Sequence, residues 1–101
     1  MDATTNMDKQ VEPLLVTILA LRTLPEARRF FRDLLTDDEL AMFARRWRVV
    51  SMLSEGASYR RIEEETGMSS RTVARIARWY KQGLGGYRLA LERRKERGTH
   101  V

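Results

Sequence analysis

Basic side chains at helical spacing are the residues of this sequence best suited to chemistry. Within residues 58–81, which read SYRRIEEETGMSSRTVARIARWYK, arginines recur at Arg71, Arg75 and Arg78. Residues separated by three or four positions share one face of a helix, so these three guanidinium groups are expected to point the same way. Arginine pairs bidentately with guanine edges and also contacts phosphates, which favours nucleic acid as the ligand.

The candidate contacts are of two kinds. Arg71 and Arg75 are expected to reach base edges, whereas Arg78 and Lys81 are expected to reach phosphates. Hydroxyl groups near the start of the same helix add nearby contacts. The predicted DNA-binding set is Ser69, Ser70, Arg71, Thr72, Arg75, Arg78 and Lys81.

Other kinds of chemistry find little support in the sequence. The chain has no cysteine, and its single histidine, His100, lies in a polar tail, so no disulfide and no metal site are expected. It has no glycine motif that would cradle a phosphate, and its carboxylates are placed like helix caps and surface pairs. We therefore expect no enzymatic activity and no cofactor.

The arginines belong to a predicted helix-turn-helix. Gly67 separates two charged segments, where a tight turn needs a residue that tolerates a positive φ. Ser58 is a candidate N-cap for a first helix that ends near Glu65. Ser69 or Ser70 can cap the second helix. The second helix carries an apolar stripe made of Val73, Ile76, Ala77 and Tyr80.

The joint register of the motif separates it from an ordinary amphipathic helix, whose outer arginines usually form only a solvated face. With Gly67 as the turn residue, apolar side chains take all the inward positions, namely Ile62, Met68, Val73 and Ile76. One position departs from the usual pattern, because Glu63 stands where alanine often allows close helix packing. We expect this glutamate to tilt outward or to loosen the packing.

The length and the net charge of the chain limit its domain count and its kinds of partner. The chain has 101 residues, of which 43% are hydrophobic, enough for one small domain but not for a large core. Its net charge of +5 favours a polyanionic partner. The longest apolar run, residues 14–21, is too short to cross a bilayer and lacks the basic flank of a signal peptide. We expect a cytoplasmic protein without membrane contact.

Two short helices are predicted at the start of the chain. Residues 1–11 are polar and are expected to be flexible. Order is expected to begin near Glu12, with Pro13 in the first turn of a helix that ends at Arg22. A second helix is expected over residues 25–35, with three buried side chains, Phe30, Phe31 and Leu34.

The entry to the third helix is the clearest local signal. Thr36 and Glu39 form a capping box, and Leu35 and Leu40 are placed as a hydrophobic staple. The helix is expected to end near residue 55, before Gly56. Its predicted apolar stripe comprises Leu40, Phe43, Trp47, Val50 and Leu53, and a solvated shoulder beside Trp47 comprises Arg45, Arg46 and Arg48.

After the motif, residues 83–86 read GLGG and predict a flexible joint. A sixth, short amphipathic helix is expected to begin at Tyr87, and residues 93–101 to form a charged tail. The pattern therefore predicts an all-α chain of about six helices. Its domain spans residues 12–92, and its helix-turn-helix spans about 58–82.

These elements resemble those of a known family. The LLTDDEL entry, the GASYRRIEEETG corner and the closing GGYRLALERR are similar to the Trp repressor-like proteins, in particular the YerC/YecD branch, over residues 14–94. The resemblance implies an all-α, interlocked homodimer joined through the first helices. It also implies that two recognition helices meet successive major grooves of a palindromic operator, about 34–36 Å apart.

The resemblance also raises the question of a corepressor. Trp repressors hold tryptophan between two arginines, and the matching positions here are Arg46 and Arg75. Those repressors have a glycine after the second arginine, whereas this sequence has Ile76. A branched side chain there would fill the space for the indole, so we expect no tryptophan corepressor.

Together, the residues and the resemblance predict a sequence-specific transcriptional regulator. We expect it to act as a dimer that represses by occluding a palindromic site in double-stranded DNA. An alternative is a protein-interaction module, in which the basic faces bind an acidic partner on an inherited helix-turn-helix scaffold. Salt-resistant binding to a protein, without binding to duplex DNA, would favour this alternative.

Overall fold

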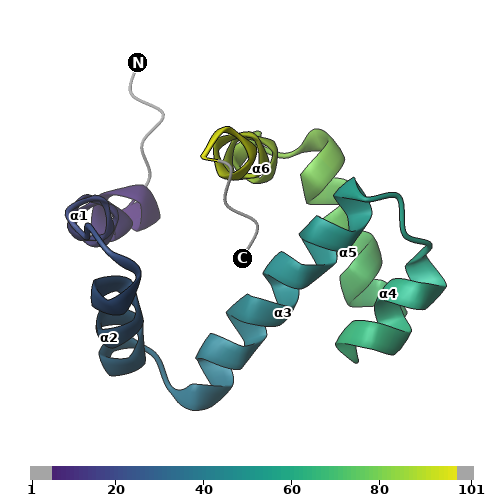
Figure 1. Ribbon diagram of the computed structural model, residues 1–101, viewed down its shortest axis with the longest axis horizontal. Helices are drawn as coiled ribbons and strands as arrows, with labels where there is room; N and C mark the ends of the chain where they lie inside the picture. The colour runs from purple at the N-terminus through teal and green to yellow at the C-terminus, as the bar shows by residue number, and fades with distance from the viewer. Residues whose placement is uncertain (1–5, 98–101) are drawn as a thin grey trace. The chain divides into compact units, whose positions relative to one another are not determined.

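The described part of the chain is helical. The computed structural model describes residues 6–97, and every regular element in this range is an α-helix (Figure 1). The six helices are α1 (Asn6–Leu19), α2 (Leu24–Leu34), α3 (Asp37–Ser54), α4 (Tyr59–Thr66), α5 (Ser70–Gln82) and α6 (Gly86–Glu96). The prediction of an all-α chain with about six helices is confirmed. The chain divides into two compact units, residues 1–40 and 41–101.

Helix α1 begins earlier than the sequence suggests. It starts at Asn6, so the expected flexible segment 1–11 and the expected start near Glu12 are wrong for residues 6–11. Pro13 lies inside the helix, and not in its first turn. Methionine, lysine and glutamine are strong helix formers, and Asp8 complements the positive end of the helix dipole. Polar composition alone therefore does not stop this helix. The remainder of the predicted segment, residues 1–5, lies outside the described residues.

Helix α2 lies close to its predicted bounds, but its predicted burial is wrong. The Thr23 hydroxyl caps the helix by accepting from the Glu26 N–H at 3.2 Å. Phe30 and Phe31 are only half-buried, and Leu34 is 47% exposed. Neither α1 nor α2 contains a buried residue. Two short helices cannot enclose a core by themselves, which is why these apolar side chains stay uncovered.

The capping box at the start of α3 is present as predicted. The Thr36 N–H donates to Glu39 Oε1 at 2.8 Å, and the Glu39 N–H donates to Thr36 Oγ1 at 3.1 Å. This reciprocal pair satisfies backbone donors that the first turn leaves unpaired. The predicted apolar stripe is only partly buried, because Val50 is fully buried whereas Phe43 is 49% exposed.

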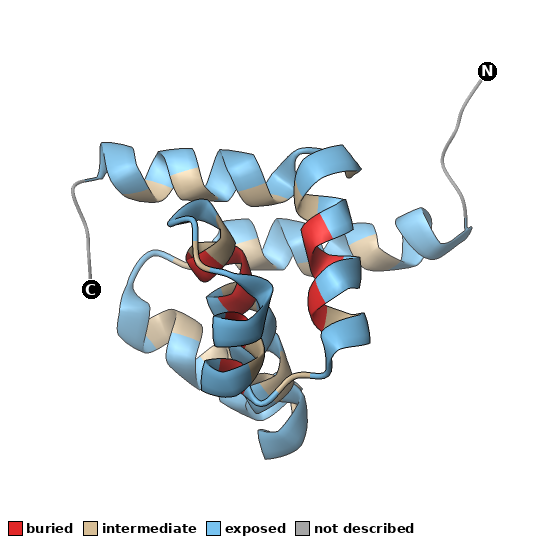
Figure 2. Cartoon of the chain, turned by 90° about the vertical axis from the view of Figure 1, so that its right-hand side faces the viewer, coloured by how far each residue is buried: buried red, intermediate tan, exposed pale blue. Residues whose placement is uncertain are grey.

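The core of the second unit lies among α3, α4 and α5 (Figure 2). Its fully buried side chains are Val49, Val50, Ile62 and Val73, and Met52, Ile76 and Ala77 complete it. Val49 and Met52 do not belong to the predicted stripe. A helix that packs against two others buries a wider face than a single stripe, and this packing brings both residues into the core.

Helix α6 is held to the core by rings and guanidinium groups. The Trp47 and Tyr87 rings lie 6.4 Å apart, and the Arg94 guanidinium lies 5.7 Å from the Trp47 ring centroid. Arg88 donates through Nε to the Tyr80 carbonyl at 3.1 Å, and its guanidinium lies 5.3 Å from the Tyr80 ring. Cation–π contacts of this kind stabilise the packing of a polar helix on an aromatic surface.

The segment between α5 and α6 has a defined backbone. The Gly83 N–H donates to the Trp79 carbonyl at 2.8 Å and ends α5. Gly85 has a φ of +87° and precedes α6, a conformation that favours glycine. Helix α6 continues to Glu96, so the first residues of the segment expected to be a charged tail, 93–96, are helical. Residues 98–101 of that predicted tail lie outside the described residues.

Candidate nucleic-acid interface

The corner between α4 and α5 has the geometry of a helix-turn-helix turn. Gly67 has a φ of +72°, in the left-handed region, and its N–H donates to the Glu63 carbonyl at 2.9 Å. The buried Thr66 hydroxyl donates to the Ile62 carbonyl at 2.7 Å and accepts from the Met68 N–H at 3.3 Å. These bonds satisfy the backbone groups that the end of α4 would otherwise leave unpaired.

Glu63, which stands where alanine often allows close helix packing, does not open the core. Glu63 is half-buried, so it keeps part of its surface in solvent. Its neighbour Ile62 and the facing Val73 are each 0% exposed. Of the two expected outcomes, the structure favours an outward tilt of the glutamate over looser packing.

The start of α5 is capped by Ser69, and not by Ser70. The Ser69 hydroxyl oxygen accepts from the Thr72 N–H at 3.1 Å, and the hydroxyl donates to Thr72 Oγ1 at 2.9 Å. Ser69 and Thr72 are therefore engaged with each other at the helix start. Ser69 and Ser70 are both exposed. Of the three predicted hydroxyl contacts, Ser70 is the one without a role in this cap.

The predicted arginines share one exposed face of α5. Arg71, Arg75 and Arg78 occupy successive turns of the helix, and all three are exposed. The opposite face carries the buried side chains of the same helix, Val73, Ile76 and Ala77. Lys81 is also exposed, in the last turn of α5. We call Arg71, Arg75, Arg78 and Lys81 the cation row.

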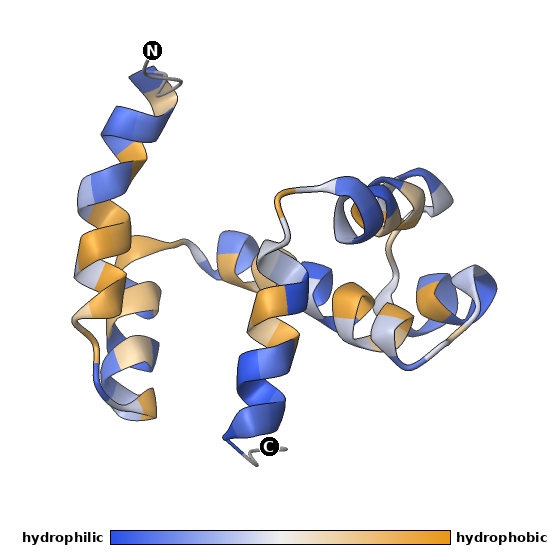
Figure 3. Cartoon of the chain, turned by 90° about the horizontal axis from the view of Figure 1, so that it is seen from above, coloured by the Kyte–Doolittle hydropathy of each residue, from blue (hydrophilic) through white to orange (hydrophobic). Residues whose placement is uncertain are grey.

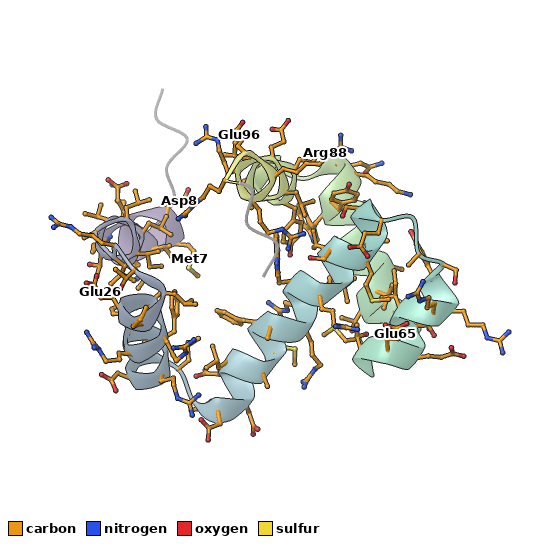
Figure 4. All side chains as sticks on the ribbon, in the orientation of Figure 1. Met7, Asp8, Glu26, Glu65, Arg88 and Glu96 are labelled. Carbon is orange, nitrogen blue, oxygen red and sulfur yellow. The ribbon has the colours of Figure 1, made fainter. Side chains whose placement is uncertain are left out.

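The cation row carries uncompensated positive charge. Helix α5 contains no acidic residue, and within the described part of the chain no ion pair involves any of its four cations. The arginines around α4 behave differently. Arg61 and Arg48 bind the two oxygens of Glu65 at 2.7 and 2.9 Å, and Arg60 approaches Glu64 at 3.4 Å. Glu65 is labelled on α4 in Figure 4. The motif therefore concentrates its free charge on its second helix, the one expected to enter a groove.

Glu65 joins α3 to α4 through its two arginines. Hydrogen bonds from Arg61 and then from Arg48 lower the pKa of the Glu65 carboxyl below its ordinary value. The same carboxylate raises the pKa of Arg61, chiefly through their hydrogen bond. Solvent screens this cluster, because the Glu65 side chain is 36% exposed. It fixes the register of α4 more than it adds to overall stability.

A pH-dependent loss of stability is expected from this cluster. A carboxyl whose pKa is lowered on folding contributes stability above its unfolded pKa, about 4.3 for glutamate. That contribution disappears as the pH falls through the lower folded pKa. We expect Glu65→Gln to lower the midpoint of urea unfolding at pH 7, with the difference from the native chain shrinking below about pH 4.3.

The matched control for this prediction is Glu64→Gln, which removes a single, more exposed ion pair with Arg60. The control is expected to change the unfolding midpoint less at pH 7. A difference between the native chain and Glu65→Gln that stays constant from neutral to acid pH would contradict the assignment.

The two positions matching the tryptophan-binding arginines are both exposed. Arg46 lies on α3 and Arg75 on α5. Ile76, which follows Arg75, is 4% exposed and belongs to the core. The pattern had placed this side chain in the packed interior, and the structure agrees. The basic shoulder at Arg45 and Arg46 is solvent-exposed as expected.

The described residues offer neither a metal site nor a membrane-spanning helix. Among residues 6–97, no group of three or more histidine, cysteine, aspartate or glutamate side chains is arranged to hold a metal ion. In the same range, none of the helices combines the length and the apolar character needed to cross a membrane.

Sequence reasoning missed several residues that organise this site. The Arg61–Glu65 pair is visible in the sequence as an i,i+4 spacing. The Arg48–Glu65 pair and the contact of Arg94 with Trp47 join residues far apart in the chain, and no local spacing indicates them. The hydrogen bonds that Thr66 makes at the end of α4 have one signal in the sequence, a hydroxyl side chain next to the predicted helix end.

The fold and the site define a helix-turn-helix protein on a small helical core. The chain belongs to the Trp repressor family: the family model described as Trp repressor protein matches residues 9–95. It is 43% identical over 91 residues to an uncharacterized protein, YerC, of Bacillus subtilis (strain 168), a match that covers 90% of this chain and 88% of that protein. The resemblance to the YerC branch is confirmed.

Two solved structures are similar to this chain. A TrpR-like protein from Eubacterium eligens ATCC 27750 is 39% identical with a TM-score of 0.78, covering 84% of this chain and 88% of that one. A proposed Trp repressor from Staphylococcus aureus is 31% identical with a TM-score of 0.79, covering 89% and 94%. The Trp repressor-like fold of this chain is thereby confirmed.

Proposed function

We propose that this protein is a sequence-specific DNA-binding transcriptional regulator. The observation that carries the proposal is the cation row of α5, whose four positive charges have no acidic partner in the described residues. A helix with a packed back and a row of free guanidinium groups suits the major groove, where arginine reads guanine and contacts phosphates. We assign base reading to Arg71 and Arg75, and phosphate contact to Arg78 and Lys81.

The regulator is proposed to act as an interlocked homodimer. Helices α1 and α2 contain no buried residue, yet they expose apolar side chains that include Leu15, Val16 and Leu19. A second chain would cover this surface, since uncovered apolar area of this kind marks an interface. Two recognition helices related by a twofold axis would then favour a palindromic operator and repress by occluding it.

The test is selection from a pool of random duplex DNA with the purified full chain at two salt concentrations. Enrichment of an inverted repeat would support a dimeric regulator and would name its operator. Salt-sensitive retention without any enriched sequence would overturn sequence specificity, because phosphate contacts alone produce that behaviour. Salt-resistant binding to an acidic protein, with no binding to duplex DNA, would favour the alternative of a protein-interaction module.

No tryptophan corepressor is proposed. Ile76 is 4% exposed and belongs to the core, and a branched side chain at this position would fill the space that an indole needs. Isothermal titration of the chain with tryptophan is expected to give no saturable heat. A tryptophan-responsive repressor measured in the same buffer serves as the positive control, and saturable uptake by this chain would contradict the prediction.

The proposed function has consequences for where the protein acts in the cell and for whether it catalyses a reaction. A regulator that binds chromosomal DNA acts in the cytoplasm of a bacterial cell, and we place this protein there. The family is a regulatory DNA-binding fold and not a catalytic one, so we propose no enzymatic activity.

A further inference from the structure

One residue on the exposed face of α5 carries no charge and no polar group. Ala74 is exposed, in the second turn of the helix, and it directly precedes Arg75. Arg71 comes three positions earlier and Arg78 four positions later, so both are its neighbours on the helix surface. The alanine methyl group therefore lies beside side chains of the cation row, which have no ion-pair partner in the described residues.

Packing within the chain does not account for Ala74. The buried side chains of α5 are Val73, Ile76 and Ala77, and Ala74 does not contribute to the hydrophobic core of the described residues. Alanine is a strong helix former, but so are arginine, lysine and glutamine, which also suit a solvated position. Helix propensity therefore explains why this segment is helical and leaves the short, apolar side chain unexplained.

The proposed homodimer does not account for Ala74 either. Hydrophobic residues gather on α1 (Figure 3), where Leu15 and Leu19 are exposed, and this is the surface that a second copy would cover. Ala74 instead lies among guanidinium groups, and charged side chains are depleted from the centre of protein interfaces. A polyanion is the ligand that such a setting favours.

The length of a side chain decides how close a helix must come to its ligand. A long arginine side chain reaches a base edge from a distance, whereas the methyl group of Ala74 contacts only atoms that lie next to the helix itself. The N-terminal residues of a recognition helix contact base edges in the major groove, and Ala74 lies in the first half of α5. A short side chain at this position therefore lets α5 approach the base edges closely.

Thymine presents the group that an alanine methyl recognises. Each base pair shows its own pattern in the major groove, and thymine adds a C5-methyl group, which alanine contacts through apolar packing. Guanine presents two acceptors, which suit the guanidinium groups of Arg71 and Arg75. The exposed face of α5 therefore combines donors for guanine with one methyl group for thymine.

We propose that Ala74 selects a thymine in each half-site of the operator by packing its methyl group against the thymine methyl group. Arg71 and Arg75 read guanine nearby. The inference rests on the proposed DNA-binding function and adds to the operator a base that differs from the guanine favoured by arginine. Ala74 stands outside the DNA-binding set predicted from the sequence, whose members all carry a polar or charged side chain.

The test replaces the thymines in one half-site of the selected operator, one at a time, with deoxyuridine. Uracil keeps the base pairing and the groove acceptor of thymine and lacks only the C5-methyl group. Labelled duplexes are titrated with the native chain. At one of these positions, uracil is expected to raise the dissociation constant about fourfold, the factor that corresponds to one buried methyl-sized group.

Two variants and one control assign this effect to Ala74. In Ala74→Gly the methyl group is absent, so thymine and uracil at that position are expected to bind equally. Ala90→Gly, at an exposed alanine of α6, carries the same helix-propensity cost and is expected to keep the fourfold difference. Ala74→Gln keeps a strong helix former and presents an amide suited to adenine, so a repeated selection is expected to lose the thymine at that position.

The contrary outcomes are distinguishable from one another. An operator at which no uracil weakens binding would overturn the role of Ala74 and leave the proposed function intact. A thymine preference that persists in both Ala74→Gly and Ala74→Gln would assign the methyl contact to another residue and overturn the inference. A random-pool selection that enriches no sequence would overturn the proposed function, and this inference with it.

Discussion

The Ile62→Ala variant is expected to lose about 2–5 kcal/mol of unfolding free energy. Ile62 is 0% exposed and lies in the core formed by α3, α4 and α5. Its removal takes away buried methyl and methylene groups and leaves a cavity that the neighbouring helices can close only in part. Urea unfolding followed by circular dichroism measures the loss. Protein concentration is held fixed, since dimerisation shifts apparent stability.

Ile62→Val is the graded control for this prediction. It removes one methylene and keeps the branched shape, so a loss of about 0.5–1.5 kcal/mol is expected. Tyr59→Ala, at an exposed position of the same helix, is expected to change stability far less. If alanine and valine at position 62 destabilised the chain equally, Ile62 would not be a closely packed core residue.

The second large effect is expected at Arg75, on binding and not on stability. Arg75→Ala should cost about 1–3 kcal/mol of binding free energy on the selected operator and relax the base preference at one position. The exposed guanidinium faces away from the core and has no ion-pair partner in the described residues, so its removal should leave the fold intact. Titration of labelled operator and of single-base variants measures both affinity and preference.

Two further variants separate base reading from charge. Arg78→Ala is expected to weaken every duplex alike and to flatten the dependence of affinity on salt, because it removes a phosphate contact. Arg93→Ala, on α6, removes the same charge away from the cation row and should leave base preference unchanged. Unchanged affinity and unchanged preference in Arg75→Ala would show that this arginine does not read bases.

The helix caps and the corner at Gly67 could be predicted because the residues that form each of them lie within about one helical turn. Thr36 and Glu39 cap α3 as expected, and Ser58 caps α4 by accepting from the Arg61 N–H at 3.2 Å. Gly67 adopts the positive φ that the corner needs. Backbone geometry over three or four residues decides all of these contacts, and residue type at fixed spacing indicates them directly.

Helix bounds at the two ends of the chain were harder to predict. Helix α1 extends back to Asn6, into a polar segment expected to be flexible, and α6 extends on to Glu96, into the segment expected to be a charged tail. Charged and polar residues are compatible with an exposed helix as long as nothing interrupts the backbone hydrogen bonds. Amino-acid composition therefore predicts whether a segment is exposed or buried better than it predicts whether that segment is helix or coil.

The amino-acid sequence is enough to predict the helical class, the corner at Gly67 and the arginine spacing of α5, since all of these depend on local hydrogen bonding and helical periodicity. Tertiary packing decided which charges are neutralised and which apolar residues are covered. It pairs Glu65 with Arg48 across 17 positions, leaves the cation row without acidic partners and leaves Trp79 exposed. These outcomes depend on which helix faces meet, and side chains distant in the chain meet only after the helices have packed.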